Sequence, residues 1–215
     1  SSAGEAVLMV NGKILGAAYC PDHICVWPSV ALRPGPNEIS ATNSNGKDMI
    51  SDKTTWNGPD PAKGVHVDSG DISGRTLGTR RFGSDNFVTG GTPAVLNQGG
   101  FGRRTSPRKV VVAPDPALYD YWREGTAFSY AIPLADGKWT VTIHTFEPSS
   151  ASAAAMSVSV GGKIVVPAFN VLKAAGGPLK GLAKSFAVTV KGGILKLDFA
   201  GQAGKVAVAA IEVAK

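Results

Sequence analysis

Short runs of alternating apolar and polar residues, each closed by Gly or Pro, recur along this chain and confine it to a β-rich fold. In the clearest run, Lys138–His144, the side chains of Trp139, Val141 and Ile143 fall on one face of an extended strand. The chain holds 27 Gly and 14 Pro among 215 residues, and both residue types are poor in helix interiors. We therefore expect an all-β fold with essentially no long helix.

Residues 65–215 repeat this alternation in a series of predicted strands. Further runs occur at Phe128–Ile132, Met156–Val160, Phe186–Val190, Leu195–Phe199 and Val206–Val213. Paired hairpins at this spacing predict an antiparallel sandwich or jelly roll. The stretch from Thr92 to Arg108 lacks the alternation and is expected to form a long loop.

Residues 1–60 predict a separate, smaller β domain. Asn11-Gly12 lies between two apolar runs, which is typical of a type I′ hairpin turn because both residues tolerate a positive φ. A second hairpin is expected around Cys20 and Cys25, with a returning strand through Val26–Leu32. Five or six short strands in this segment predict an immunoglobulin-like sandwich, joined to the second domain by a Pro-rich linker at residues 57–64.

Composition and charge exclude several classes of protein. With 43% hydrophobic and 18% charged residues, the chain can bury a core and is not disordered. No apolar run approaches the roughly 20 residues of a membrane span. Residues 65–215 hold 17 Lys or Arg against 10 Asp or Glu, a net charge of +7. These basic residues are scattered over many predicted strands and turns, so a solvated surface is favoured over nucleic-acid binding.

The two cysteines, Cys20 and Cys25, have a spacing that bears on their chemistry. The C-x₄-C spacing excludes a C-x-x-C redox motif, and His23 is the only histidine nearby, too few groups for a zinc site. A disulfide across the predicted hairpin is expected in an oxidising compartment, and two buried thiols are the alternative.

Catalytic motifs are absent from the sequence. It contains no P-loop, no H-E-x-x-H and no G-x-S-x-G motif. The histidines at 23, 66 and 144 lie in different predicted elements. Glu124 and Glu147 could form a glycosidase-like pair of carboxylates only if the fold brought them together, and nothing in the sequence does so. We expect no catalytic residue, no metal and no cofactor.

The segment Leu118–Arg123 is the richest in aromatic residues. Tyr119, Tyr121 and Trp122 offer flat faces with polar edges, which suit stacking on a sugar ring. Arg123 and Glu147 could then supply the polar contacts that orient the sugar. The alternative is that these rings fill the sandwich core. One such platform predicts weak binding, with a Kd of about 1 mM.

The second domain resembles malectin domains from about Val65 to Lys215. The matching motifs are Phe87–Gly91, Leu118-Tyr119 with Arg123, Phe128–Leu134, Gly137–Val141, Phe169–Val171, Ala174–Gly177 and Ala209–Val213. The resemblance implies a jelly-roll sandwich, and several malectin domains bind glucans or other carbohydrates. Glu147 matches the acidic end of a central strand, while Ser149 and Ser150 stand where sugar-binding members place adjacent aromatic residues.

The first domain is similar to the small immunoglobulin-like domain near the C-terminus of family 2 glycoside hydrolases. The similarity rests on Val10–Lys13 with Leu15-Gly16, on Val26–Pro28 and on Leu32–Asn37. The order of the two modules implies the tail of a secreted β-galactosidase-like enzyme from bacteria, whose catalytic barrel would lie upstream. The opening Ser1–Glu5 fits a cut fragment or a matured end.

These observations favour a non-catalytic accessory region of a glycoside hydrolase. It would support the catalytic domain of the parent enzyme and bind carbohydrate, outside the cell or in the periplasm, with no nucleic-acid or membrane partner. The alternatives are a stand-alone carbohydrate-binding module and a purely structural or protein-interaction module.

Overall fold

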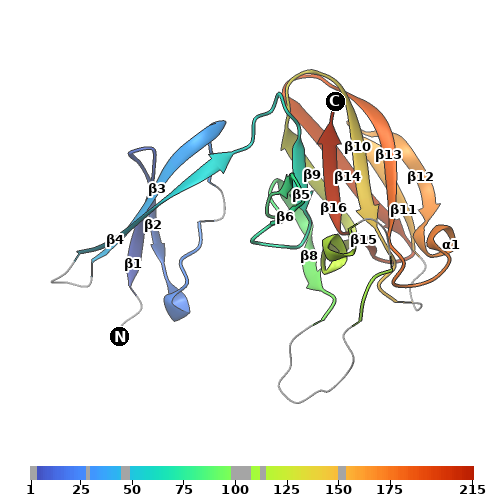
Figure 1. Cartoon of the computed structure of the whole chain (residues 1–215), viewed down its shortest axis with the longest axis horizontal. Helices are drawn as coiled ribbons and strands as arrows, with labels where there is room; N and C mark the ends of the chain where they lie inside the picture. The colour runs from blue at the N-terminus through green and yellow to red at the C-terminus, as the bar shows by residue number, and fades with distance from the viewer. Residues whose placement is uncertain (1–3, 28–29, 45–48, 98–107, 112–114, 150–153) are drawn as a thin grey trace, which may run out of the picture. The chain divides into compact units, whose positions relative to one another are not determined.

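A computed structural model of the chain describes residues 4–27, 30–44, 49–97, 108–111, 115–149 and 154–215. The chain divides into two compact units, Ser1–Asp60 and Pro61–Lys215. Strands make up most of each unit, which confirms the expected all-β fold (Figure 1). Among the described residues, helical structure is limited to the five-residue helix α1 (Val171–Ala175) and two 3₁₀ turns, η1 (Pro21–His23) and η2 (Pro116–Tyr119). No helix in this part of the chain is long and apolar enough to cross a membrane.

The first unit is built on one antiparallel sheet with the strand order β2-β1-β3-β4. Its strands are β1 (Glu5–Val10), β2 (Lys13–Tyr19), β3 (Gly35–Ser44) and β4 (Met49–Gly58). The expected turn at Asn11-Gly12 joins β1 and β2, with φ values of 51° and 77°. Asn11 also donates from Nδ2 to Asn37 Oδ1 at 2.9 Å. This hydrogen bond ties the turn to the start of β3.

The predicted returning strand at Val26–Leu32 is wrong for the residues that the structure describes. Cys20 and Cys25 form a disulfide around η1, with 4.2 Å between their Cα atoms. The chain then crosses one face of the sheet, where Trp27, Val30 and Leu32 pack on a buried cluster of Leu8, Val10 and Ile39. The alternating apolar residues therefore cover the sheet instead of joining it. The unit has four described strands in one sheet, not five or six, and its immunoglobulin-like character stays a prediction.

The second unit contains two larger sheets that enclose its main core. One sheet has the order β13-β10-β16-β5, and the other has the order β12-β11-β14-β9-β15, with β8 also paired to β9. The strands are β5 (Val65–Asp68), β8 (Val88–Val95), β9 (Tyr121–Pro133), β10 (Gly137–Thr145), β11 (Ala155–Val160), β12 (Lys163–Asn170), β13 (Leu182–Val190), β14 (Ile194–Gln202), β15 (Val206–Val208) and β16 (Ala210–Ala214). A separate hairpin pairs β6 (Arg75–Leu77) with β7 (Arg80–Phe82).

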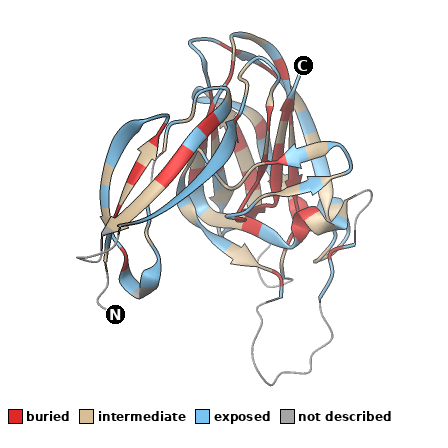
Figure 2. Ribbon diagram, turned by 60° about the vertical axis from the view of Figure 1, so that its left-hand side comes forward, coloured by how far each residue is buried: buried red, intermediate tan, exposed pale blue. Residues whose placement is uncertain are grey.

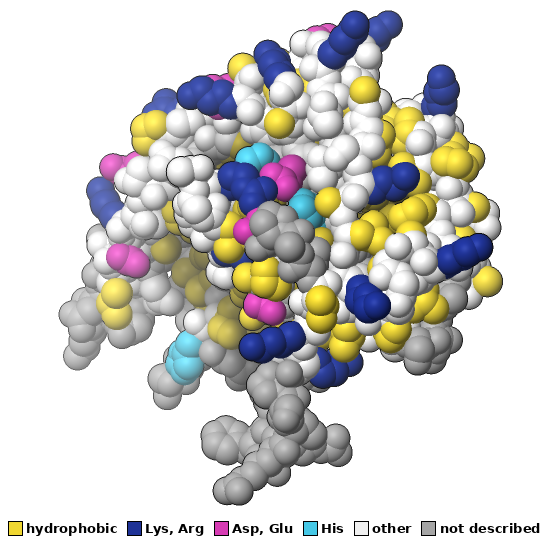
Figure 3. All heavy atoms as spheres, turned by 45° about the vertical axis from the view of Figure 1, so that its right-hand side comes forward, with side chains coloured by type: hydrophobic (Ala, Val, Ile, Leu, Met, Phe, Trp, Pro, Cys, Tyr) yellow, Lys and Arg dark blue, Asp and Glu magenta, His cyan; other side chains and the backbone are white. Residues whose placement is uncertain are grey.

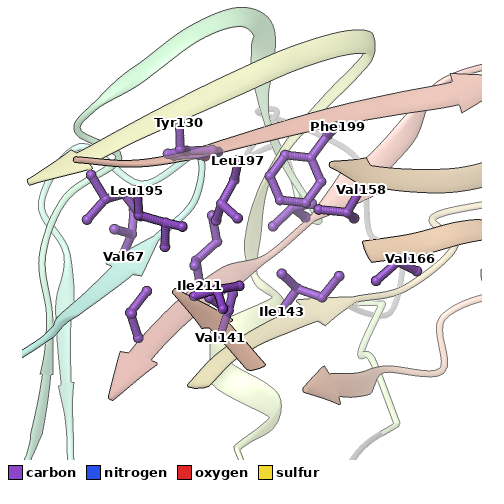
Figure 4. Close-up of a cluster of buried hydrophobic side chains, with 14 of the residues drawn as sticks. Val67, Tyr130, Val141, Ile143, Val158, Val166, Leu195, Leu197, Phe199 and Ile211 are labelled. Carbon is purple, nitrogen blue, oxygen red and sulfur yellow. The ribbon is translucent and has the colours of Figure 1, made fainter. Parts of the chain in front are cut away.

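The core follows the alternation of the sequence. Trp139, Val141 and Ile143 of β10 are at most 2% exposed. Figure 4 shows Val141 and Ile143 facing buried side chains from the opposite sheet. Buried positions alternate with exposed ones along many of the strands (Figure 2). His144 lies on the outer face of β10, as the alternation predicts, yet it is only 7% exposed. Another segment of the chain therefore covers the sheet at this point.

Two predicted boundaries in the second unit are wrong. The strand expected at Phe128–Ile132 begins at Tyr121, so Tyr121 and Trp122 belong to β9, while Tyr119 lies on η2. Residues 92–95, expected in the long loop, belong to β8. A register shift between Gly90 and Thr92 interrupts the alternation of this strand, and β8 pairs with β9 alone. Such an edge strand tolerates Pro93. Residues 98–107 of the expected loop lie outside the described residues.

Candidate functional site

Two of the three predicted sugar-stacking rings are buried. The side chains of Tyr119 on η2 and Trp122 on β9 are 1% and 5% exposed. Both rings meet Phe146 edge to face, with centroid distances of 5.7 Å and 5.2 Å. Tyr119, Trp122 and Phe146 belong to a second buried cluster, separate from the main core. The rings of Tyr119 and Trp122 are packed inside this cluster. Neither ring therefore exposes a face on which a sugar could stack.

Tyr121 is the predicted ring that keeps an exposed side. It is 36% exposed, and the guanidinium of Arg75 lies 5.6 Å from its ring centroid. Arg75 is in turn bound by Asp68 at 2.5 Å and Asp71 at 3.2 Å, and it donates to the carbonyl oxygen of Ala117. The ring and its cationic neighbour are thus held at a fixed place on the surface.

Arg123, the fourth predicted residue, makes a structural contact instead of facing the rings. Its guanidinium binds the Asp85 carboxylate at 2.6 Å and donates to the carbonyl oxygens of Gly90 and Gly91, each at 3.1 Å. These bonds fasten the bulge of β8 to β9. The Tyr130 hydroxyl also donates to Asp85, at 2.7 Å.

Glu147, the fifth predicted residue, directly follows Phe146 and is 6% exposed. Burial raises the pKa of its carboxyl to about 7, and the nearby Glu124 carboxylate adds to the rise. Glu124 accepts hydrogen bonds from Trp122 Nε1 and Lys205 Nζ, both at 2.9 Å. Burial opposes ionisation of Glu124, but these two bonds outweigh it and lower its pKa. The fold thus brings the two carboxylates near one another, beside Trp122.

A polar cluster that the sequence did not indicate lies on the outer face of the sheet β13-β10-β16-β5. Glu212 of β16 accepts from His144 Nε2 at 2.7 Å and from Arg80 Nη1 at 2.9 and 3.0 Å. Arg80 also pairs with Asp115, and the Tyr119 hydroxyl lies 3.3 Å from His144 Nδ1. Figure 3 shows two histidine side chains close to basic and acidic side chains on one face of the molecule.

This cluster holds Glu212 as a carboxylate. The hydrogen bond from His144 lowers the pKa of Glu212 to about 2, with help from Arg80 and against the effect of burial. His66 of β5 completes the cluster, with Nε2 3.8 Å from Glu212 Oε2 and its ring tilted against Phe82 at 5.2 Å. Burial lowers the pKa of His66, so its imidazole is neutral at pH 7. This cluster could not be predicted from the sequence because strands β5, β10 and β16 are far apart along the chain.

Within the described residues, no group of three or more His, Cys, Asp or Glu side chains could hold a metal ion. The two histidines of the cluster are engaged with Glu212, Phe82 and Tyr119.

The comparisons with known structures find a similar fold over nearly the whole length of the chain. It is similar over 98% of its length to a Bacteroides uniformis β-glucuronidase 2 covalently bound to cyclophellitol-6-carboxylate aziridine, with a TM-score of 0.57 and 15% identity. The chain covers only 26% of that protein. It is also similar over 99% of its length to the plant receptor-like kinase FER, with a TM-score of 0.54, 11% identity and 77% of that chain covered.

A third structure, the plant receptor-like kinase ANX1, matches 98% of the chain at 9% identity, with a TM-score of 0.53 and 78% of that chain covered. At such low identities these structures support the fold alone. No curated protein matches the chain at the level of sequence. The model of the malectin domain family, however, matches residues 63–214. This match covers most of the chain, which therefore belongs to the malectin domain family.

Proposed function

We propose that this chain is a non-catalytic accessory region of a secreted bacterial glycoside hydrolase resembling β-galactosidase, and that its malectin domain binds carbohydrate. The observation that carries the proposal is the likeness of both units together to about a quarter of a β-glucuronidase chain, 98% of this chain against 26% of that one. In such a protein most of the length remains for a catalytic domain, which would be the chain's main partner.

The carboxylates near the aromatic cluster favour a non-catalytic role. Glu124 is held by Trp122 and Lys205, and Glu147 is buried beside it. A retaining or inverting glycosidase needs two carboxyl groups that flank an accessible substrate. We expect the chain alone not to hydrolyse aryl galactosides or aryl glucuronides. Turnover that survives repurification and disappears in Glu147→Gln would contradict this.

Tyr121 is the residue of the predicted set best placed to contact a sugar. Its ring is partly exposed and is fixed by Arg75, so stacking would order few additional groups. With a single exposed ring, the expected Kd is about 1 mM, equivalent to about −4 kcal/mol. An affinity of this size matters when the module is tethered to an enzyme, because tethering raises the effective concentration.

Chemical-shift titration with methyl galactosides and short glucans tests the carbohydrate-binding function. We expect millimolar shifts in the second unit, reduced several-fold by Tyr121→Ala. Tyr19→Ala is the matched control, because Tyr19 is an exposed tyrosine of the first unit, at 65% exposure. No response to any saccharide would contradict carbohydrate binding.

A second candidate is a protein-interaction module. It is supported by the likeness to FER, which has been determined in complex with the plant peptide RALF23 and LLG2. In this case the chain would bind the remainder of its parent protein or a partner subunit and would not respond to sugars. Pull-down of the separately expressed catalytic domain, together with a negative saccharide titration, would favour this candidate.

Secretion or a periplasmic location is part of the proposal. The disulfide between Cys20 and Cys25 supports it, because disulfides persist in oxidising compartments. Signal-dependent export of the full-length parent protein in its native host is the direct test. A parent protein that stays in the cytosol would contradict it.

A further inference from the structure

Four polar residues form one continuous row across the outer face of the sheet β13-β10-β16-β5. The backbone register pairs His66 with Glu212, Glu212 with Thr142, and Thr142 with Ser185. Paired residues of neighbouring strands point to the same face of a sheet. We call these four side chains the outer-face row. Their sequence neighbours Val67, Ile211 and Val141 belong to the core on the opposite face.

The outer-face row is reachable from solvent. The side chains of His66 and Glu212 are 26% and 16% exposed, Ser185 is exposed and Thr142 is half-buried. Figure 3 shows acidic, basic and histidine side chains close together on one face of the molecule. A ligand could therefore contact these groups without unfolding any strand.

The row holds hydrogen-bonding capacity that the protein itself does not use. His66 Nε2 and Glu212 Oε2 are 3.8 Å apart, too far for a hydrogen bond. Within the described residues the His66 ring makes no hydrogen bond, while Glu212 Oε2 accepts one, from Arg80. A carboxylate oxygen can accept a second bond. One hydroxyl group placed beside this gap could donate to Glu212 and accept from His66.

The rest of the row is already oriented. Arg80 and His144 fix the Glu212 carboxylate from two sides. The hydroxyls of Thr142 and Ser185 are 2.8 Å apart, and each retains unused capacity for a further bond. Groups carried by strands and fixed by a second set of contacts make precise binding sites, because little freedom is lost when the ligand arrives.

We propose that the outer-face row is a carbohydrate-binding track, in which Glu212 and His66 bind a hydroxyl of one sugar ring and Thr142 and Ser185 bind hydroxyls further along the glycan. The inference rests on the proposed carbohydrate-binding function and adds to it a second contact site, distinct from Tyr121. Adjacent strands are about 4.8 Å apart, so the row extends over about 14 Å. An oligosaccharide should therefore bind better than a single ring.

The charges of the site select for neutral sugars. Arg80 contributes one positive charge, against the carboxylates of Glu212 and Asp115 that it already binds. The guanidinium is therefore occupied by these two carboxylates. A uronic acid would bring a further carboxylate close to Glu212 and would be repelled. Neutral glycans bring no charge, and this site can both accept hydrogen bonds from their hydroxyls and donate to them.

NMR spectroscopy of the histidine Cε1–H signals provides the test. His66 and His144 report on the row, and His23 of the first unit is an internal reference. Methyl β-galactoside, cellobiose, cellotriose and glucuronic acid are the probes. We expect saturable shifts of the His66 signal, none of His23, affinity that rises with the number of rings, and no response to glucuronic acid.

Variants separate binding by the row from other effects. His66→Phe keeps the ring against Phe82 but removes both nitrogens, and Glu212→Gln removes the charge. Each should weaken cellotriose binding by about five- to tenfold, the effect of one hydrogen bond. Thr140→Val, at an exposed position outside the row on the same strand as Thr142, should leave it unchanged. In His66→Phe the His66 signal is lost, so the backbone amide shifts of β16 report on binding instead. The spectrum of Glu212→Gln must first show that the domain is folded.

The possible results distinguish this inference from the proposed function. Saccharide shifts that occur near Tyr121 while His66 and β16 stay unmoved would overturn the track and leave carbohydrate binding intact. Absence of shifts anywhere would overturn both. Equal binding of glucuronic acid and neutral sugars at His66 would overturn the charge argument and with it this assignment.

Discussion

Single residues show most clearly where packing overrides a sequence pattern. The alternation in β10 correctly assigns His144 to the outer face, but Tyr119 covers it and a carboxylate from β16 binds it. Neither partner is within 20 residues of His144 in the chain. Burial raises the pKa of the Tyr119 hydroxyl, so it remains a neutral hydrogen-bonding group there. A local pattern predicts the direction of a side chain, whereas its environment depends on distant segments.

Gly70 is a residue at which a methyl group should be poorly tolerated. Its φ is 85°, and a Cβ at this position would overlap the carbonyl oxygen of Trp122 on β9. Gly78 is the matched control, because its φ of 59° is also positive but a Cβ there would meet nothing within 4 Å. We expect Gly78→Ala to cost about 1 kcal/mol of unfolding free energy, from backbone strain alone.

Gly70→Ala should cost at least twice as much, because the loop would have to move away from β9 as well. Chemical denaturation of the two variants beside the parent protein measures the difference. Equal losses in the two variants would show that the loop before β6 is not held against β9 as described.

At the scale of elements, the disulfide loop gives a direct prediction. Cys20 and Cys25 enclose only η1, and closing so short a loop stabilises a protein by about 2 kcal/mol on the chain-entropy estimate. Reduction should therefore weaken the first unit by no more than this and leave the second unit unchanged. Thiol titration of the denatured, unreduced protein should find no free thiol; two free thiols would contradict the pairing.

The strands that could be predicted from sequence are those with an uninterrupted alternation. Runs such as Lys138–His144 and Met156–Val160 correspond to β10 and β11 because each has one face on the core. β8 could not be recognised, since its two glycines and Pro93 break the pattern at a bulge on an edge strand. The segment after Cys25 had the right composition for a strand but serves as a cover for the sheet.

The candidate site was predictable only in part. The aromatic content of residues 119–122 identified a real cluster, but which rings face solvent is decided by Phe146 and Arg75, which approach from other elements. The outer-face row depends on the register of four strands, and the sequence does not reveal strand order. The sequence therefore identifies individual polar and aromatic residues as candidates, but it does not show which of them the fold brings together.

At the scale of the whole molecule, buried acids make the stability of the second unit depend on pH. Burial raises the pKa of Asp68 to about 6, despite the opposing effect of Arg75, and that of Glu147 to about 7. A raised pKa means that the folded state holds a proton that the unfolded state releases near pH 4. The stability that these two groups contribute is greatest below about pH 4 and falls as the pH rises to 7.

Each of these two groups contributes at most about 3.5 kcal/mol to this fall. Glu212 acts in the opposite direction, because its lowered pKa gives stability that is present above its unfolded value and lost as the pH drops toward 2. Urea denaturation at pH 4.5 and pH 7.5 tests the sign, and Glu147→Gln should flatten the slope. A protein that is more stable at pH 7.5 would contradict this account.

Strand β16 lies between β10 and β5 in the middle of its sheet, although it comprises residues 210–214. Its partner β5 is nearly 150 residues earlier in the chain. During synthesis, β5 and β10 therefore emerge from the ribosome long before β16 does. Until then, the edges of β5 and β10 that pair with β16 remain without a partner strand. Pairings over such long separations form slowly. We expect a fragment that ends at Gly204 to expose apolar surface and bind a hydrophobic dye, so that this domain completes its fold only after residue 214 has left the ribosomal tunnel.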